Sequence, residues 1–295
     1  MTGYLKEFFE RFGYEKEDAD YLVDQLTLIE NSEAKEKWNA LICDYENCID
    51  RAFNYYLEGA RKCGETVGMH AYTAEFLMLV CLARGTERLY KKKGISAEIF
   101  ENSFLDLKYK LEECKLVKGI KGTFVAGWFD RWFDVTRFAL GRLQFELIDA
   151  EYDYEKYGRS VKKGDKVINV HIPRTGTPFT PEKCQESFDR AAEFFKEEIK
   201  GDIAFVCHSW LLYPPLKDEL SDGMNTKAFA ERFDIVSSGD NGEGNHHDVW
   251  RLFDHDYNGD PDSLDTSTSL RAAFVSMIKK TNKSGWGSGI FFYNK

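Results

Sequence analysis

The spacing of hydrophobic residues differs between the two halves of this chain of 295 residues. Before Gly141, apolar residues recur at every third or fourth position, which is the spacing of helices with one buried face. One stripe predicts a single helix of about five turns, and it consists of Trp38, Leu41, Ile42, Tyr45, Ile49, Ala52, Phe53 and Tyr56. The segment 71–83 is apolar nearly all round, so we expect it to lie centrally among other helices.

Two further segments before Gly141 also predict helices. Ser96 is a suitable cap for a helix from Ala97 to about Cys114. The segment 125–139 is crowded with aromatic residues, namely Trp128, Phe129, Trp132, Phe133 and Phe138. Aromatic stripes at helical spacing usually belong to a core or a domain interface, so we interpret this one as packing and not as a ligand cage.

After Gly141 the pattern changes to the alternation of strands. Between residues 142 and 148, polar residues alternate with Leu143, Phe145 and Leu147, and a second strand begins near Val167. If the two strands are neighbours, one face of the sheet collects polar side chains, namely Arg142, Gln144, Glu146, Asn169 and His171.

A strand, loop, helix and strand follow one another between Lys166 and Pro215. Thr180 followed by Pro181 is a helix start, and the run 203–210 is apolar enough for a strand covered on both faces. The remaining chain predicts a helix at 225–232, strands at 233–237 and 249–253, a helix at 270–278 and a closing strand at 285–294. The predicted class is therefore α+β, with a helical domain at 1–122 and an α+β domain at 123–295.

Composition narrows the class of protein. Hydrophobic residues make up 43% of the chain, which suffices for a sizeable core, and the net charge of −10 disfavours nucleic acid as a partner. No apolar run approaches the ~20 residues of a membrane span. The seven cysteines include no CxxC pair, so we expect reduced thiols and a cytoplasmic location, with no membrane partner.

Three strings carry a resemblance to a known family: GRLQFEL at 141–147, HIPRTGTPFTPEKCQESFDRAAEFF at 171–195 and CHSWLLYP at 207–214. Together with TSLRAAFVSMIKK near the end, they resemble bacterial acyltransferase-domain proteins with a helical N-terminal domain (the N-acyltransferase N-terminal type) and a GNAT-like C-terminal domain. The resemblance covers essentially the whole chain. It implies a mixed-sheet acyl-CoA N-acyltransferase fold, in which substrate binds where two central strands diverge.

The resemblance also implies a loop that holds the coenzyme A pyrophosphate through backbone amides. The corresponding residues here are Arg174, Thr175, Gly176, Thr177 and Thr180. The loop lacks the second glycine of the family pattern, and Pro178 and Pro181 each remove an amide donor. Glu182, near the helix start, would repel phosphate. A non-catalytic GNAT-like binding or regulatory protein that has lost the coenzyme A site is therefore the alternative function.

The function that we expect is transfer of an acyl group from acetyl-CoA or another acyl-CoA to a small-molecule amine or an amino group. Such a transfer needs a base for the ammonium proton and a donor for the leaving thiolate. Glu146 or His171 is the candidate base, and His208 or Tyr213 the candidate acid. The competing interpretation of Glu146 and His171 is the solvated face of an antiparallel sheet. The sequence indicates no oligomeric state.

Cys207 and His208 cannot form a nucleophile–base pair, because adjacent strand residues point to opposite faces. No metal is expected, although one loop has the oxygen-ligand spacing of a calcium site, with candidate ligands Asp254, Asp256, Asn258, Asp262 and Asp265. Pro261 and the short Asp265 depart from that pattern. His246, His247 and Asp248 are a weaker metal candidate, since adjacent histidines in a glycine-rich loop are usually solvated.

Overall fold

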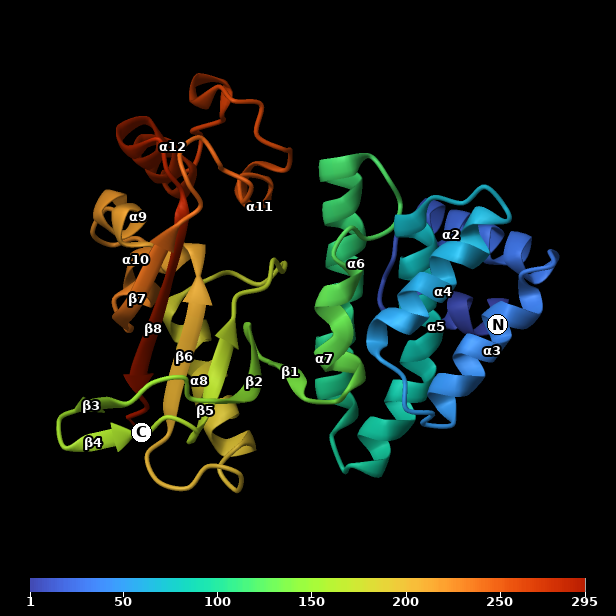
Figure 1. Ribbon diagram of the computed structural model, residues 1–295, viewed down its shortest axis with the longest axis horizontal. Helices are drawn as coiled ribbons and strands as arrows, with labels where there is room; N and C mark the ends of the chain where they lie inside the picture. Colours follow the sequence, from blue (N-terminus) through green and yellow to red (C-terminus); the bar gives the residue numbers. More distant parts are fainter. Residues whose placement is uncertain (295) are drawn as a thin grey trace. The chain divides into compact units, whose positions relative to one another are not determined.

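The computed structural model describes residues 1–294 and separates into two compact units, which divide after Phe138. The first unit is helical (Figure 1). Its elements are α1 (Thr2–Arg11), α2 (Lys16–Glu30), α3 (Lys35–Glu46), α4 (Phe53–Glu65), α5 (Ala71–Lys92), α6 (Ala97–Lys118), the 3-10 helix η1 (Ala126–Phe129) and α7 (Asp130–Phe133). As predicted, α5 is central, because its residues from Thr73 to Ala83 are all buried.

The stripe from Trp38 to Tyr56 does not form one continuous helix. It is divided between α3 and α4 by residues 47–52. Asn47 ends α3, and Cys48 has a left-handed backbone with a φ of 55°. A non-glycine residue in that conformation cannot continue a right-handed helix. The prediction of a single long helix was therefore wrong, although both halves are helical.

The aromatic segment after Gly122 also differs from the predicted helix. It forms η1 and the one-turn α7, and Val135, with a φ of 56°, ends the helical run before β1 (Arg137–Leu140). Trp132 donates its indole N–H to the Ser103 carbonyl at 3.0 Å, and Phe133 stacks on Phe53 at 5.3 Å between ring centroids. The segment thus packs as core of the first unit, whereas the sequence placed the domain boundary near Gly122.

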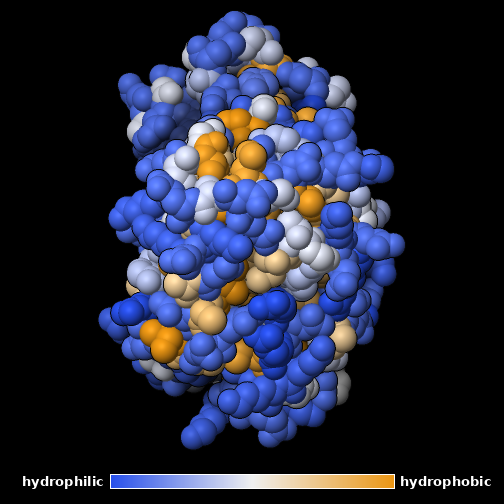
Figure 2. All heavy atoms as spheres, turned by 90° about the vertical axis from the view of Figure 1, so that its right-hand side faces the viewer, coloured by the Kyte–Doolittle hydropathy of each residue, from blue (hydrophilic) through white to orange (hydrophobic). Residues whose placement is uncertain are grey.

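One face of the first unit is mainly polar. Figure 2 shows a face where hydrophilic residues predominate and apolar ones gather in small patches. Exposed large apolar side chains of this unit include Leu28, Ile49, Tyr55 and Leu116. None of the helices within residues 1–294 combines the length and the apolar composition that a membrane crossing requires.

The second unit is built on a six-stranded mixed sheet with the strand order β1-β2-β5-β6-β8-β7. The strands after β1 are β2 (Leu143–Asp149), β5 (Lys166–His171), β6 (Ala204–Ser209), β7 (Asp234–Asp240) and β8 (Gly285–Phe292), and a separate hairpin joins β3 (Tyr154–Lys156) to β4 (Arg159–Val161). The helices are α8 (Pro181–Phe194), η2 (Trp210–Leu212), α9 (Pro214–Glu219), α10 (Asn225–Ala230), α11 (Trp250–Phe253), η3 (Pro261–Ser263) and α12 (Ser269–Thr281). This arrangement confirms the predicted α+β class.

One face of the sheet packs on α8 through an aromatic cluster. Phe188 of α8 lies 4.9 Å from Phe205 and 5.1 Å from Phe291, measured between ring centroids, and makes edge contacts with both. Thr180 caps the helix as predicted, since its hydroxyl accepts the backbone N–H of Lys183. Burying a phenylalanine stabilises a fold by about 1.5–3 kcal/mol, so this cluster fixes α8 against the central strands.

The parallel pairing between β5 and β6 is short. It joins Ile168 to Phe205 and Asn169 to Val206, and no later residue of either strand is paired across it. Beyond those pairs, β5 continues to His171 alongside β2, and β6 continues to Ser209 alongside β8. The two central strands therefore part at their carboxyl ends, as the family resemblance implies, and we call the gap between them the notch.

The C-terminal elements follow the predicted order with one correction. Residues 249–253, predicted as a strand, contain the one-turn helix α11. Val249 and Phe253 are both buried, and the backbone N–H of Phe253 bonds to the Val249 carbonyl at 2.9 Å. The two apolar residues thus face the same core at helical spacing, which the short run of letters could not distinguish from a strand.

Gly287 on β8 tests how tightly the sheet packs. A Cβ atom at this position would lie 2.1 Å from the backbone carbonyl oxygen of Leu212. Backbone cannot yield as a side chain can, so Gly287→Ala should lower the free energy of unfolding by about 1–3 kcal/mol. Gly3→Ala is the control, because nothing lies within 4 Å of its Cβ position. Equal denaturation midpoints for the two variants would contradict the packing described.

Candidate functional site

The polar face predicted from the sequence exists, and strand register assembles it. In the antiparallel pair of β2 and β5, Gln144 lies opposite His171 and Glu146 lies opposite Asn169. Directly opposed residues point to the same face of a sheet. Gln144 and Glu146 are only 2% and 6% exposed, so the interpretation of this face as a solvated surface is wrong.

Glu146, His171 and Asn169 form a hydrogen-bonded group at the notch. The Nε2 atom of His171 lies 2.6 Å from Glu146 Oε1, and Asn169 donates its side-chain N–H to the same oxygen at 3.1 Å. A carboxylate can only accept, so the imidazole donates to it through Nε2, and the Asn169 side-chain nitrogen lies 3.2 Å from the same Nε2. The group thus holds the His171 ring in position at the end of β5.

Arg142 has a different role from the rest of this face. Its guanidinium donates to the Pro173 carbonyl at 2.9 Å and lies over the Phe179 ring at 5.1 Å. Its backbone N–H donates to the buried hydroxyl of Ser187 on α8 at 2.7 Å. Arg142 therefore braces the loop between β5 and α8.

His208 lies across the notch from β5, on β6. The register Asn169 to Val206 puts His208, two residues further along, on the same face as His171. The side chain is exposed, its Nδ1 lies 2.8 Å from the Ser288 hydroxyl, and its ring lies 4.6 Å from Trp286. His208 is therefore accessible and held in orientation by β8.

Tyr213 lies beyond the end of β6, in an apolar cluster that includes Leu211, Leu216 and Phe274. The side chain is only 7% exposed. Burial raises the pKa of Tyr213, so the phenol keeps its proton. The phenol has a proton to give, but Tyr213 is less open to a ligand than His208 is.

The loop between β5 and α8 is only partly equipped to hold phosphate. The guanidinium of Arg174 is ion-paired with Asp254, and the backbone N–H of Thr177 already donates to the Thr175 hydroxyl at 3.2 Å. Bonds from its own N–H and from Thr180 lower the pKa of Glu182, so a carboxylate stands at the start of α8. A phosphate at this loop would have to take Arg174 from Asp254.

Cys207 has the surroundings of a packing residue. It is buried on β6, and burial raises the pKa of its thiol to about 12. At neutral pH the thiol therefore stays protonated, and the thiolate is the reactive form. The side chain packs as a small apolar residue.

The calcium-like loop is organised around basic side chains. Asp254 pairs with Arg174 and Arg271, Asp265 also pairs with Arg271, and Asp262 pairs with Lys279. The side chain of Asn258 bonds to the Ser263 hydroxyl. Within residues 1–294 no group of three or more His, Cys, Asp or Glu side chains could hold a metal ion.

The two adjacent histidines after Gly244 point to different surroundings. His246 is 3% exposed and meets the Tyr257 ring edge-on at 5.0 Å. His247 is exposed, and its Nε2 lies 3.4 Å from Asp248. The pair does not form a metal site, and His246 is a core residue.

The fold and the notch define a GNAT-like acyltransferase architecture, and the comparisons agree. The family model of the GNAT-like C-terminal domain matches residues 138–291, and that of the N-acyltransferase N-terminal domain matches residues 3–135. The chain therefore belongs to the family of proteins with a GNAT-like C-terminal domain, which confirms the resemblance seen in the sequence. No curated protein matches it.

Similar solved structures extend over the whole fold. An acyltransferase in complex with decanoyl-CoA and teicoplanin has 21% identity and a TM-score of 0.73, over 98% of this chain and 87% of that one. A mutant acyltransferase in complex with octanoyl-CoA has 20% identity, the same TM-score and the same coverage of both chains. At these identities the likeness is one of fold.

Sequence reasoning brought Glu146 and His171 together but missed two contacts. Asn169 was placed on the polar face without a role, although it shares Glu146 Oε1 with His171. The pairing of Arg174 with Asp254 joins positions 80 residues apart. Strand alternation could have indicated the first contact, whereas no local pattern indicates the second.

Acidification should destabilise the protein through His246. Burial lowers the pKa of His246, although a bond with Asn282 opposes this. The unfolded state, with a histidine pKa of about 6.5, binds a proton that the folded state resists. Stability is then complete above that pH and is lost as the pH falls through the folded pKa. His246→Gln should therefore lose less unfolding free energy between neutral pH and pH 5 than the natural protein.

The matched control is His247→Gln, which removes an exposed imidazole next to it in the chain. Chemical denaturation at a series of pH values gives the unfolding free energy of each variant as a function of pH. If His246→Gln shows the same pH dependence as the natural protein, the buried imidazole is not the titrating group.

Proposed function

We propose that this protein is an acyl-CoA-dependent N-acyltransferase whose acceptor is an amine. The observation that carries the proposal is the Glu146–His171 pair, with a 2.6 Å contact, at the end of β5 beside the notch. Family membership supports the acyl-CoA co-substrate, and so do the decanoyl-CoA and octanoyl-CoA bound in the similar structures. Teicoplanin in one of them supports a small-molecule acceptor.

In this proposal the pantetheine arm of an acyl-CoA lies along the notch. Past Asn169 and Val206, the facing edges of β5 and β6 have no strand partner in each other. The amides of a pantetheine arm can bond to such an edge, as an added strand does. The pyrophosphate would then lie near residues 174–180, where Arg174, Thr175, Gly176, Thr177 and Thr180 are the candidate contacts.

In the proposed mechanism, His171 takes a proton from the acceptor's ammonium group, directly or through a water. Glu146 holds the imidazole through Nε2 and stabilises the imidazolium that forms, and Asn169 orients the carboxylate. The neutral amine attacks the thioester carbonyl, and a tetrahedral intermediate forms. Collapse of the intermediate breaks the carbon–sulfur bond, and the second proton of the attacking nitrogen passes, directly or through a general acid, to the departing sulfur, so that the amide and the coenzyme A thiol are released.

The leaving thiolate needs a proton or a hydrogen bond. His208 is the better candidate, because it is exposed on β6 at the notch and its Nδ1 contacts Ser288. Tyr213 remains the second candidate, since its raised pKa keeps the phenol protonated. Separate His208→Gln and Tyr213→Phe variants test which of the two residues donates to the leaving thiolate.

Acyl-CoA binding is the first test. Any ligand that binds only the folded state must stabilise it, by about 2.7 kcal/mol at a hundredfold excess over Kd. Decanoyl-, octanoyl- and acetyl-CoA should therefore raise the melting temperature, with the preferred chain length giving the largest rise. If all three fail, the non-catalytic alternative with a lost coenzyme A site replaces this proposal.

The ion pair of Arg174 with Asp254 gives a sharper prediction. If phosphate takes Arg174 from Asp254, Asp254→Asn should tighten acyl-CoA binding and Arg174→Ala should weaken it. A hydrogen bond to a charged group is worth about 1.5–3 kcal/mol, so calorimetry should give a change of roughly tenfold or more. Asp262→Asn, which removes another ion-paired carboxylate of the same loop, is the control. Unchanged affinity in both Arg174→Ala and Asp254→Asn would remove Arg174 from the site.

His171→Gln tests the chemistry. Loss of a general base typically costs 10²–10⁴-fold in rate, so kcat should fall by about that factor while acyl-CoA still raises the melting temperature. The rate is that of coenzyme A thiol release from decanoyl-CoA, measured with a panel of amines that includes teicoplanin. His247→Gln, an exposed histidine outside the site, should keep the natural rate. An undiminished rate in His171→Gln would exclude His171 as the base.

A further inference from the structure

A cavity of about 380 Å³ lies in the second unit, at the opposite end of the sheet from the notch. The notch opens where β5 and β6 end, and β8 runs antiparallel to β6, so the last residues of β8 lie at the far end. The volume falls in the range of small-molecule sites. The lining consists of Lys156, Tyr157, Arg159, Gln185, Arg232, Asp234, Phe291, Phe292, Tyr293 and Asn294.

The cavity exists because β8 extends past β7. Asp234, the first residue of β7, pairs with Ile290, so Phe291 and Phe292 have no strand beside them on that edge. The Phe291 ring is half-buried: Phe205 stacks on it at 5.3 Å, and Phe188 and Phe233 meet it edge-on at 5.1 and 5.0 Å between centroids. An aromatic side chain that is held in this way and also lines a cavity can make a further contact with a flat ring.

Two of the three cations that line the cavity are already neutralised. Lys156 donates to both oxygens of Asp234, at 2.8 and 2.6 Å. Arg159 donates to Asp202, to the Asn294 side chain and to the Tyr293 carbonyl. Both side chains therefore hold the β3–β4 hairpin to the sheet and do not attract a further anion.

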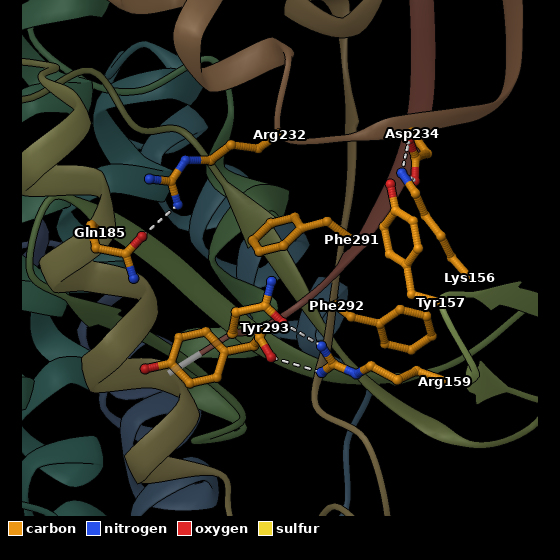
Figure 3. Close-up of a pocket in the computed structure, with 10 residues that line it drawn as sticks. Lys156, Tyr157, Arg159, Gln185, Arg232, Asp234, Phe291, Phe292 and Tyr293 are labelled. Carbon is orange, nitrogen blue, oxygen red and sulfur yellow. Dashed lines mark hydrogen bonds and ion pairs between the residues drawn. The ribbon is translucent and has the colours of Figure 1, made fainter.

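Arg232 differs from the other two cations. Its guanidinium donates to Gln185 Oε1 at 2.7 Å and lies 5.3 Å from the Phe188 ring centroid, and it makes no ion pair with any residue from 1 to 294. Gln185 is held in turn, since its side-chain N–H donates to Asp189 at 2.7 Å. In Figure 3, Arg232 and Gln185 lie on one side of the Phe291 ring, with Lys156 and Tyr157 on the other. A positioned guanidinium without a carboxylate is a receptor for one.

We propose that this cavity binds a small aromatic carboxylate, at a site separate from the acyl-CoA notch. The ligand ring packs against Phe291, and the carboxylate accepts paired N–H bonds from Arg232, for which the planar guanidinium is suited. A neutral aromatic molecule cannot make the ion pair with Arg232, and a small inorganic anion cannot pack a ring against Phe291. The assignment does not depend on the acyltransferase proposal.

Calorimetry and melting curves with benzoate, phenylacetate and indole-3-acetate test the site, with benzamide and inorganic phosphate as probes of the two halves. At least one acid should bind and raise the melting temperature, and Arg232→Gln should weaken it by roughly tenfold or more. Arg232→Lys should fall between the two, because it keeps the charge and loses the paired geometry. Arg190→Gln, which changes an arginine of α8 that is paired with Glu186, should bind as the natural protein does.

Three results would overturn the proposal: no binding of any aromatic acid at millimolar concentration, equal binding by Arg232→Gln, or equal binding of phosphate and the acids. The unliganded melting temperature of each variant shows whether it is folded. Saturating decanoyl-CoA should leave acid affinity unchanged, and competition would place the acid in the notch instead. If acyl-CoA does not bind, the acyltransferase proposal fails, but the titration with aromatic acids still tests this site.

Discussion

The antiparallel register of β2 against β5 is the constraint on which the candidate site depends. It sets Glu146 opposite Asn169 and Gln144 opposite His171, so that four polar side chains share a face on which Gln144 and Glu146 are buried. A slip of one residue would turn this set toward α8 and turn Phe145 away from Phe188. The aromatic cluster and the polar group therefore enforce the same register from opposite faces of the sheet.

Several buried polar groups near the candidate site have hydrogen-bond partners. Glu146 accepts two hydrogen bonds, and the buried Ser187 hydroxyl accepts the Arg142 N–H and donates to the Lys183 carbonyl. Leaving such a group unpaired in a low-dielectric interior costs more than the bond itself contributes. The loop after β5 is thus tied to α8 through Arg142 and Ser187, while its outer residue Arg174 is ion-paired with Asp254.

The sequence predicted most of the architecture because period, caps and turn residues are local signals. Thr180 with Pro181 indicated the start of α8, and alternation indicated β2 and β5. The failures were also physical. Left-handed residues at Cys48 and Val135 interrupt helices that hydrophobic periodicity alone would continue, and two apolar residues around Trp250 fit a turn of helix as well as a strand. At the site, strand pairing made Glu146 and His171 predictable, whereas Arg174 with Asp254 depends on how a distant loop folds back.

The short ladder between β5 and β6 has a mechanical consequence. Only two residue pairs join the strands β1, β2 and β5 to the strands β6, β8 and β7, so the continuity of the sheet there depends on α8 and the rings around Phe188. The sheet thus consists of two three-stranded parts that meet along a narrow seam, and the Phe188 cluster packs across that seam. A molecule bound between the ends of β5 and β6 would supply hydrogen bonds that the two strands do not make to each other. Binding would then make this unit more rigid.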